Sequence, residues 1–98
     1  MYYKMALEID DQNSEVHYNL GNSYYLNEMI EEAVYHYNAA IKLNPNKPES
    51  HYNLGNALCF RNAYSEAVEA YYKATQLDKT NAPAFYNFGN ALYMLGKF

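Results

Sequence analysis

The side chains in this sequence that could do chemistry are mainly asparagine amides placed at a fixed spacing. Two rows repeat at intervals of 34 residues: Asn19, Asn53 and Asn87, and Asn22, Asn56 and Asn90. A carboxamide can donate to a backbone carbonyl and accept from a backbone N–H at the same time. Two parallel rows of amides could therefore hold an extended peptide by its backbone without reading its side chains.

Two further rows at the same spacing could add contact area. One is aromatic (Tyr18, Tyr52 and Tyr86), and the other is apolar (Leu26, Phe60 and Met94). Tyrosine offers flat, rigid area with a polar tip, and an exposed apolar row is typical of a binding surface. Two alternatives remain open. The tyrosines and asparagines could serve helix packing and solubility, and a neighbouring segment of a longer chain could cover the apolar row.

Residues with more reactive side chains are few and isolated. Cys59 has no adjacent histidine or basic residue that would lower its pKa. His17 and His51 repeat at the same spacing but lack a third ligand, so we interpret them as packing residues, and His36 as a surface residue. The sequence contains no phosphate loop, nucleophile elbow or metal motif. It therefore predicts no enzyme activity, no cofactor and no metal site.

The rows belong to an internal repeat. A six-residue stretch occurs at residues 17–22 and 51–56, and with two changes at 85–90. When residues 14–47 are aligned with 48–81, 13 of 34 positions are identical, which chance does not produce. A period of this length is typical of stacked units that bury their apolar faces on one another. The predicted organisation is the second half of a preceding repeat (1–13), two complete repeats (14–47 and 48–81) and the first helix of a third (82–98).

Each complete repeat contains two apolar patterns with helical periodicity, at residues 14–27 and 30–43 in the first. Pro45 cannot continue the second helix, and Pro48 suits the first turn of the next. Ser14 and Asn81 are candidate N-cap residues. With a helix at 1–9 and one after residue 81, the sequence predicts six helices and no strand, an all-α protein.

Glycine recurs inside the predicted first helices, at Gly21, Gly55 and Gly89. A glycine within a helix costs about 1 kcal/mol relative to alanine, so three at one position need a packing reason. Alanines recur in the second helices, at Ala6, Ala40 and Ala74. We therefore expect the two helices of each repeat to cross closely at these small residues.

On these residues the chain resembles the tetratricopeptide repeat (TPR) family. The first repeat carries its pattern in Leu20-Gly21, Tyr24, Ala33, Tyr37, Ala40 and Pro45. The departures are His17, His51 and Phe85 where the family favours Trp, Leu58 and Leu92 where it favours Tyr, and Lys79 where it favours Pro. We expect Asp78 and Asn81 to hold the turn around Lys79. The resemblance implies an α-solenoid of antiparallel helix pairs, the TPR superhelix.

The resemblance also implies that the first helix of each repeat lines a concave groove. At about 100° per residue, one stripe of these helices holds the rows described above, with Glu15, Glu49 and Pro83 at its start. The predicted peptide-binding residues are Tyr18, Asn19, Asn22, Tyr25, Leu26, Tyr52, Asn53, Asn56, Cys59, Phe60, Tyr86, Asn87, Asn90, Tyr93 and Met94.

Chaperone-binding members of the family hold a C-terminal carboxylate with a clamp of lysine, asparagine and arginine. Asn22 and Asn53 match two asparagine positions of that clamp, but Tyr18, Pro83 and Asn87 stand where its cations are needed. Without a cation the charge-assisted bonds to a carboxylate are missing. The sequence therefore favours a neutral or mildly basic peptide.

Composition excludes other partners. A net charge of −4 with 7 Lys and Arg lacks the basic stripe that nucleic acids or anionic membranes attract. No run of about 18 apolar residues could span a bilayer, and the first ten residues are too polar for a secretory signal. A single cysteine fits a reducing compartment, so we expect a cytoplasmic location.

The sequence thus predicts a protein–protein interaction module that binds an extended or helical peptide segment. Two alternatives are the substrate-recruiting arm of a larger enzyme, such as an O-linked sugar transferase, and a structural spacer or assembly element. The end segments, 1–9 and the helix after residue 81, carry apolar sides without polar caps, as expected for a fragment of a longer array. They are complementary, so head-to-tail self-association is also predicted.

Overall fold

The computed structural model describes the backbone of residues 2–96 and the side chains of residues 13–96. The described backbone forms helices and turns only, which confirms the all-α prediction. The helices are, in order, α1 (Tyr2–Leu26), α2 (Ile30–Leu43), α3 (Pro48–Phe60), α4 (Tyr64–Leu77) and α5 (Ala82–Gly96).

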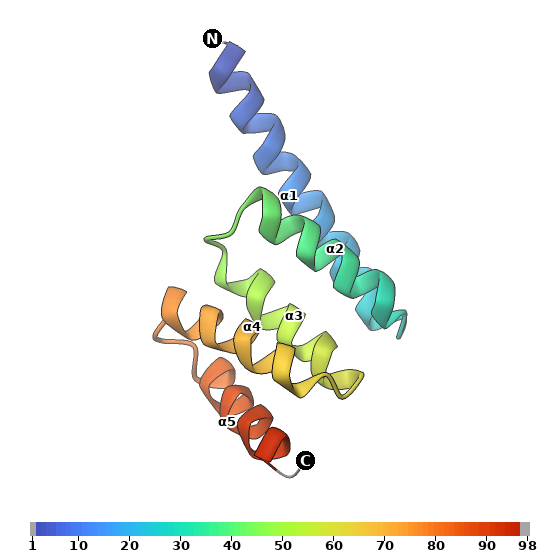
Figure 1. The fold of residues 1–98 in the computed structure, drawn as a ribbon. Helices are drawn as coiled ribbons and strands as arrows, with labels where there is room; N and C mark the ends of the chain where they lie inside the picture. Colours follow the sequence, from blue (N-terminus) through green and yellow to red (C-terminus); the bar gives the residue numbers. More distant parts are fainter. Residues whose placement is uncertain (1, 97–98) are drawn as a thin grey trace.

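Successive helices run antiparallel and stack along one direction (Figure 1). Helices α1 and α2 form one hairpin, α3 and α4 form a second, and α5 packs on α4. The odd-numbered helices also touch one another, α1 with α3 and α3 with α5. The chain therefore forms two layers, with α1, α3 and α5 in one layer and α2 and α4 in the other.

Helix α1 differs from the sequence prediction. Two helices with a break at residues 10–13 were expected, but one continuous helix runs from Tyr2 to Leu26, and its first half extends past the end of α2 (Figure 1). No proline lies in this range, whereas Pro45 and Pro48 interrupt the next equivalent junction. The prediction that Ser14 caps a helix is therefore wrong. Ser14 is buried within α1, where its hydroxyl donates to the Ala40 carbonyl at 3.1 Å.

The other predicted turn features are confirmed. Pro48 is the first residue of α3, and the Asn81 side chain caps α5 by accepting from the Ala84 N–H at 3.1 Å. At the turn without proline, the Asp78 carboxylate accepts from the Thr80 N–H at 3.0 Å and its hydroxyl at 2.6 Å. These bonds lower the pKa of Asp78.

The glycines explain how the hairpins close. A Cβ added at Gly21 would lie 2.7 Å from the Tyr37 ring, and one at Gly55 would lie 2.6 Å from the Tyr71 ring. Both tyrosines are 1% exposed, so neither ring has space to withdraw. The predicted close crossing is confirmed at these two glycines. At Gly89 a Cβ would meet nothing within 4 Å, because no described helix covers that side of α5.

Within residues 2–96, no helix is both long enough and apolar enough to cross a membrane.

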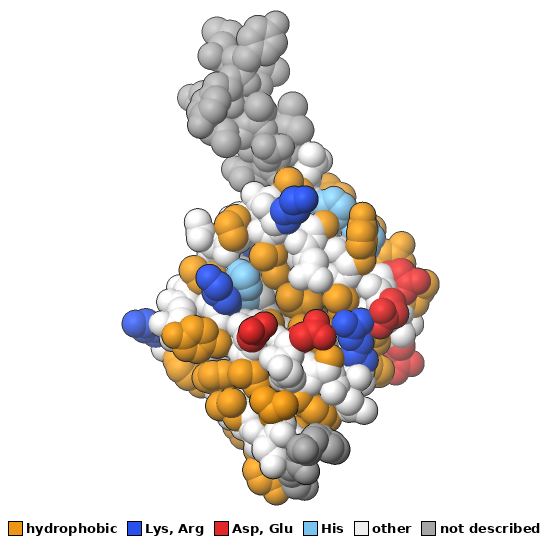
Figure 2. Space-filling view, viewed as in Figure 1, with side chains coloured by type: hydrophobic (Ala, Val, Ile, Leu, Met, Phe, Trp, Pro, Cys, Tyr) orange, Lys and Arg blue, Asp and Glu red, His pale blue; other side chains and the backbone are white. Residues whose placement is uncertain are grey.

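The face formed by α2 and α4 carries interspersed acidic and basic side chains (Figure 2). An ion pair between Arg61 and Glu31, with N–O distance 2.6 Å, joins the two hairpins at their turns.

Candidate peptide-binding groove

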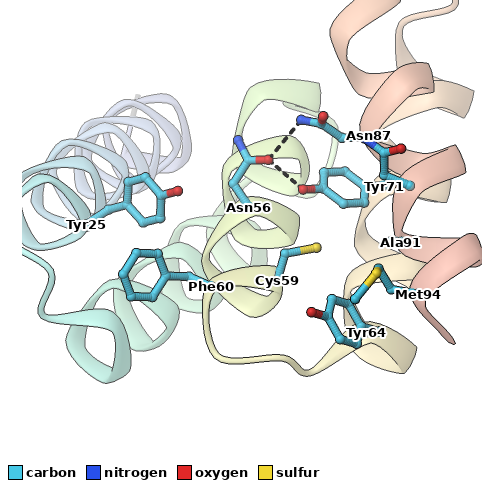
Figure 3. A pocket seen from close by; sticks show the side chains of 10 residues that line it. Tyr25, Asn56, Cys59, Phe60, Tyr64, Tyr71, Asn87, Ala91 and Met94 are labelled. Atoms are coloured by element: carbon cyan, nitrogen blue, oxygen red, sulfur yellow. Dashed lines mark hydrogen bonds between the residues drawn. The ribbon is translucent and has the colours of Figure 1, made fainter. Parts of the chain in front are cut away.

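A pocket of about 400 Å³ opens between α1, α3 and α5 (Figure 3). The first helices of three successive repeats supply most of its walls, and α4 supplies two tyrosines. The lining residues are Tyr25, Asn56, Cys59, Phe60, Tyr64, Tyr71, Asn87, Asn90, Ala91 and Met94. Seven of the fifteen residues predicted from sequence are thus brought together: Tyr25, Asn56, Cys59, Phe60, Asn87, Asn90 and Met94.

Beside the pocket, a hydrogen-bond network joins the two hairpins through asparagine and tyrosine side chains. The Tyr37 hydroxyl donates to Asn22 Oδ1 at 2.5 Å. The Asn53 amide group donates to the same oxygen at 3.2 Å and to the Tyr18 hydroxyl at 3.0 Å. Asn22 on α1 is therefore tied both to its own hairpin and to α3.

The same network recurs one repeat later at the pocket wall (Figure 3). The Tyr71 hydroxyl donates to Asn56 Oδ1 at 2.5 Å. Asn87 Nδ2 donates to that oxygen at 3.2 Å and to the Tyr52 hydroxyl at 3.2 Å. The recurrence shows that these side chains hold adjacent first helices in register, which is the packing role that the sequence left open.

The network also fixes which end of each amide faces the groove. Both lone pairs of Oδ1 in Asn22 and Asn56 are occupied, and both Nδ2 hydrogens of Asn53 and Asn87 are used. No hydrogen bond within residues 13–96 uses the amide nitrogens of Asn22 and Asn56 or the amide oxygens of Asn53 and Asn87. The groove therefore presents donors at Asn22 and Asn56, and acceptors at Asn53 and Asn87.

Aromatic and sulfur-containing side chains form the apolar part of the pocket. The Tyr25 ring meets the Phe60 ring edge-on, with centroids 6.2 Å apart. Phe60 is 54% exposed at the pocket mouth, and Met94 lies on the α5 wall (Figure 3). Leu26 occupies the same repeat position as Phe60, but it is 81% exposed and lies outside the pocket.

Burial suppresses the ionisation of the pocket's titratable groups. It raises the pKa of the Cys59 thiol, although a hydrogen bond with Tyr71 acts in the opposite direction. Burial likewise raises the pKa of Tyr71 and Tyr25. The pocket is therefore uncharged at neutral pH, and Cys59 is a protonated thiol unsuited to nucleophilic attack.

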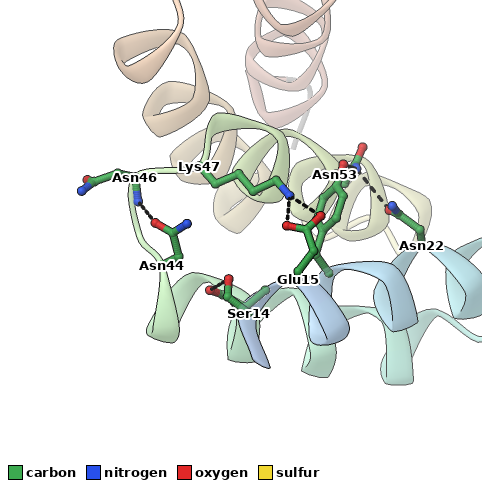
Figure 4. A network of polar contacts seen from close by, with 9 residues as sticks. Ser14, Glu15, Asn22, Asn44, Asn46, Lys47 and Asn53 are labelled. Atoms are coloured by element: carbon green, nitrogen blue, oxygen red, sulfur yellow. Dashed lines mark hydrogen bonds and ion pairs between the residues drawn. The ribbon is translucent and has the colours of Figure 1, made fainter. Parts of the chain in front are cut away.

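One cation approaches the groove from a turn, which the sequence prediction missed. Lys47 lies just before α3, and its Nζ sits 3.9 Å from the centroid of the Tyr18 ring. The same Nζ forms an ion pair with Glu15 at 2.8 Å (Figure 4). Since Glu15 already neutralises this charge, Lys47 adds no free cation to the groove.

The remaining predicted residues lie around the pocket. Tyr18, Asn22, Tyr52 and Asn53 form the networks, while Asn19, Leu26, Tyr86 and Tyr93 are exposed outside the pocket lining. Sequence reasoning missed Tyr64, Tyr71 and Ala91 as lining residues. The stripe contained only first-helix residues, and Ala91 lies on the side of α5 that packs against α4. The recurrence of Tyr37 and Tyr71 was the available signal.

The histidines pair differently from the expected pattern. His17 and His36 face each other with their Nδ1 atoms 2.9 Å apart, so the prediction that His36 is a simple surface residue is wrong. His51 instead contacts the Pro45 carbonyl through Nε2 at 2.9 Å. Among the described side chains, no group of three His, Cys, Asp or Glu residues could hold a metal ion.

Stacked antiparallel hairpins with a 34-residue period and a pocket along their first helices define a helical-repeat protein of the α-solenoid class. Family models described as tetratricopeptide repeat and TPR repeat match residues 2–35 and residues 21–59 and 55–96, respectively. The chain belongs to the tetratricopeptide repeat family.

Solved structures agree with this assignment. The Arabidopsis OM64 TPR domain is 30% identical, with a TM-score of 0.85 over 90% of this chain and 73% of that one. The second TPR domain of Spaghetti (RPAP3), bound to the HSP90 peptide SRMEEVD, is 25% identical, with a TM-score of 0.88 over 95% and 85%. MamA is 26% identical, with a TM-score of 0.84 over 96% of this chain and 55% of that one. Comparison with curated proteins gives no match.

Proposed function

We propose that this chain is a non-catalytic protein–protein interaction module that binds an extended peptide segment along α1, α3 and α5. The carrying observation is the fixed polarity of the amide row. Asn56 presents a donor and Asn87 an acceptor beside one pocket. An extended peptide offers backbone carbonyls and N–H groups that match both. The RPAP3 domain, which has the same fold, binds a peptide.

The pocket suits an uncharged side chain of that peptide. Its walls are aromatic, aliphatic and thiol groups with neutral amides at one edge. Burying a charged group among them would be costly without a partner. A bulky apolar residue of the ligand would instead contact Phe60, Met94 and Tyr64 while its backbone meets the amides.

The proposal also separates this groove from one that holds an acidic chain end. The peptide in the RPAP3 complex, SRMEEVD, carries three acidic residues and ends in one of them. In the groove described here, Lys47 is paired with Glu15, and Tyr18 and Asn87 are neutral. We therefore expect SRMEEVD to bind this chain weakly or not at all. A cytoplasmic location is part of the same proposal and rests on the unpaired Cys59.

A screen of random-sequence peptides with free and amidated C-termini would test the proposal. Selected peptides are measured by calorimetry against the wild type, Phe60→Glu and Leu26→Glu. Phe60 lines the pocket, whereas Leu26 occupies the same repeat position and does not. We expect Phe60→Glu to weaken binding at least about tenfold, because a desolvated carboxylate would replace an apolar contact, while Leu26→Glu binds like the wild type.

Circular dichroism of both variants checks that they fold. Because both side chains are exposed, neither substitution should alter the helix content. Failure to select any peptide would overturn the proposal, and so would peptides that bind Phe60→Glu as tightly as the wild type. Tight binding of SRMEEVD would overturn its prediction of a neutral or basic ligand.

A further inference from the structure

The ion pair between Glu15 and Lys47 has the geometry of a carboxylate-binding site that is already filled (Figure 4). Lys47 Nζ lies 3.0 Å from one carboxylate oxygen of Glu15 and 2.8 Å from the other, so it donates to both. The same Nζ lies 3.9 Å from the centroid of the Tyr18 ring. A carboxylate and an aromatic face thus hold the ammonium group together.

The two partners of this pair differ in their exposure to solvent. The Lys47 side chain is 21% exposed, whereas the Glu15 side chain is 57% exposed. A mostly covered ammonium group has lost much of its contact with water, so it still needs a counter-charge when its partner leaves. A carboxylate that is more than half exposed can move into solvent at little cost. Glu15 is therefore the partner that another carboxylate could replace.

The pair adjoins the amides that the proposed function assigns to the ligand backbone. The Tyr18 hydroxyl accepts from Asn53 Nδ2 at 3.0 Å, and the same nitrogen donates to Asn22 Oδ1 at 3.2 Å. Tyr18 thus contacts Lys47 with its ring face and Asn53 with its hydroxyl. A peptide held by Asn22 and Asn53 would therefore pass its neighbouring side chain next to the ion pair.

The next repeat has the carboxylate but lacks the cation. Glu49 follows Glu15 by 34 residues, and Asn81 stands 34 residues after Lys47. The Asn81 side chain caps α5 by accepting from a backbone N–H. Glu49 is exposed and forms no ion pair among the described side chains. The cation is thus specific to the α1–α3 end of the groove, and Glu49 provides a matched site without it.

We propose that Lys47 and the Tyr18 ring form a carboxylate-binding subsite at the α1–α3 end of the groove, and that Glu15 fills it and so excludes acidic ligands. The subsite rests on the proposed function, because it assigns the charge preference of the same peptide groove to one residue. A ligand carboxylate enters only by displacing Glu15, which leaves two carboxylates beside one cation. Lys47 is not one of the clamp cations of chaperone-binding members, whose positions are occupied here by Tyr18, Pro83 and Asn87.

Two glutamine substitutions test the subsite with the peptide SRMEEVD and its amidated counterpart SRMQQVN, which has no carboxylate. Glu15→Gln keeps the shape of the side chain but removes its charge, so Lys47 becomes free to bind a ligand carboxylate. Glu49→Gln removes the same charge from the same repeat position, where no cation is freed. In calorimetry we expect Glu15→Gln to bind SRMEEVD at least about tenfold more tightly than the wild type and Glu49→Gln do. Amidated SRMQQVN should gain no affinity from Glu15→Gln.

A double variant assigns the gain to Lys47. Glu15→Gln combined with Lys47→Met should lose the gain, because methionine still packs on the Tyr18 ring but carries no charge. Binding of SRMEEVD to Glu15→Gln that is no tighter than to the wild type, undetectable binding included, would overturn the proposal. A gain that Glu49→Gln shares, or that the double variant keeps, would also overturn it.

Failure of the proposed function gives a different result. It would be seen in the uncharged peptides selected on the wild type and in Phe60→Glu, and neither readout involves Lys47. Selected peptides that depend on Phe60, together with no gain in Glu15→Gln, would overturn the subsite alone. A gain in Glu15→Gln that Lys47→Met removes would support the subsite even where Phe60→Glu binds like the wild type.

Discussion

Helices α3 and α5 carry nearly the same central stretch, yet they lie in different surroundings. The sequences are HYNLGN at residues 51–56 and FYNFGN at residues 85–90. On α3 the glycine meets the Tyr71 ring and the following asparagine accepts its hydroxyl. On α5 the glycine faces open space. The motif thus specifies a helix with a notch, meaning the space left over its glycine. How much the notch contributes to stability depends on whether a ring from a neighbouring helix fills it.

The largest expected effect is a difference in stability between replacing a tyrosine that fills a notch and replacing one that does not. Tyr71 is 1% exposed and Tyr86 is 71% exposed. Tyr71→Ala should lower the free energy of unfolding by about 3–5 kcal/mol, because it leaves a cavity over Gly55 and removes the bond to Asn56. Tyr86→Ala should change it by less than about 0.5 kcal/mol. Urea denaturation followed by circular dichroism measures both, and similar losses would contradict the comparison.

The next effect is the change in stability when glycine is replaced by alanine, which should have opposite signs in α3 and α5. Gly55→Ala should destabilise by about 1–3 kcal/mol, since its methyl group would overlap a buried ring that cannot withdraw. Gly89→Ala should stabilise by up to about 1 kcal/mol, because alanine is the better helix former and the space is open. The comparison requires monomeric protein, so both are measured at low concentration. A destabilising Gly89→Ala would show that α5 is already covered in solution.

Periodicity and turn chemistry were enough to predict most of the fold. Apolar spacing, Pro48 and the Asn81 cap located the junctions after α2 and before α5, and the repeated glycines indicated close crossing. The continuous α1 escaped prediction, because the polar residues 10–13 end a helix only when a turn is imposed on them. Helix propensity alone permits them to continue one.

The candidate groove was predictable in part. A helical wheel places side chains on one face, so it found the first-helix residues of the pocket. It could not find Tyr71, which comes from the other layer and reaches the pocket only because Gly55 lets the helices approach. Nor could it assign the orientation of Asn56 and Asn87, which depends on hydrogen bonds between residues 15 and 31 positions apart.

The smallest expected effect is a pH dependence of stability that arises at one position where the two hairpins differ. His36 on α2 contacts His17, whereas its counterpart on α4 is Ala70. An Nδ1–Nδ1 distance of 2.9 Å requires one nitrogen to carry a hydrogen and the other to accept it. Burial and the neighbouring His17 charge lower the pKa of His36 below its usual value. Protonating both rings would leave no acceptor and remove this bond, a loss that has no counterpart in the second hairpin, where Ala70 stands at the equivalent position.

The sign of this pH dependence follows from the lowered pKa of His36. In the unfolded chain His36 titrates near its ordinary pKa of about 6.5. As the pH falls below that value, the unfolded state takes up protons before the folded state does, so stability declines. The urea midpoint should therefore be lower at about pH 5.5 than at about pH 7.5. His36→Phe should remove this part of the change. Asp78, whose lowered pKa acts only at more acidic pH, should not contribute. An unchanged pH dependence in His36→Phe would assign the acid sensitivity to other groups.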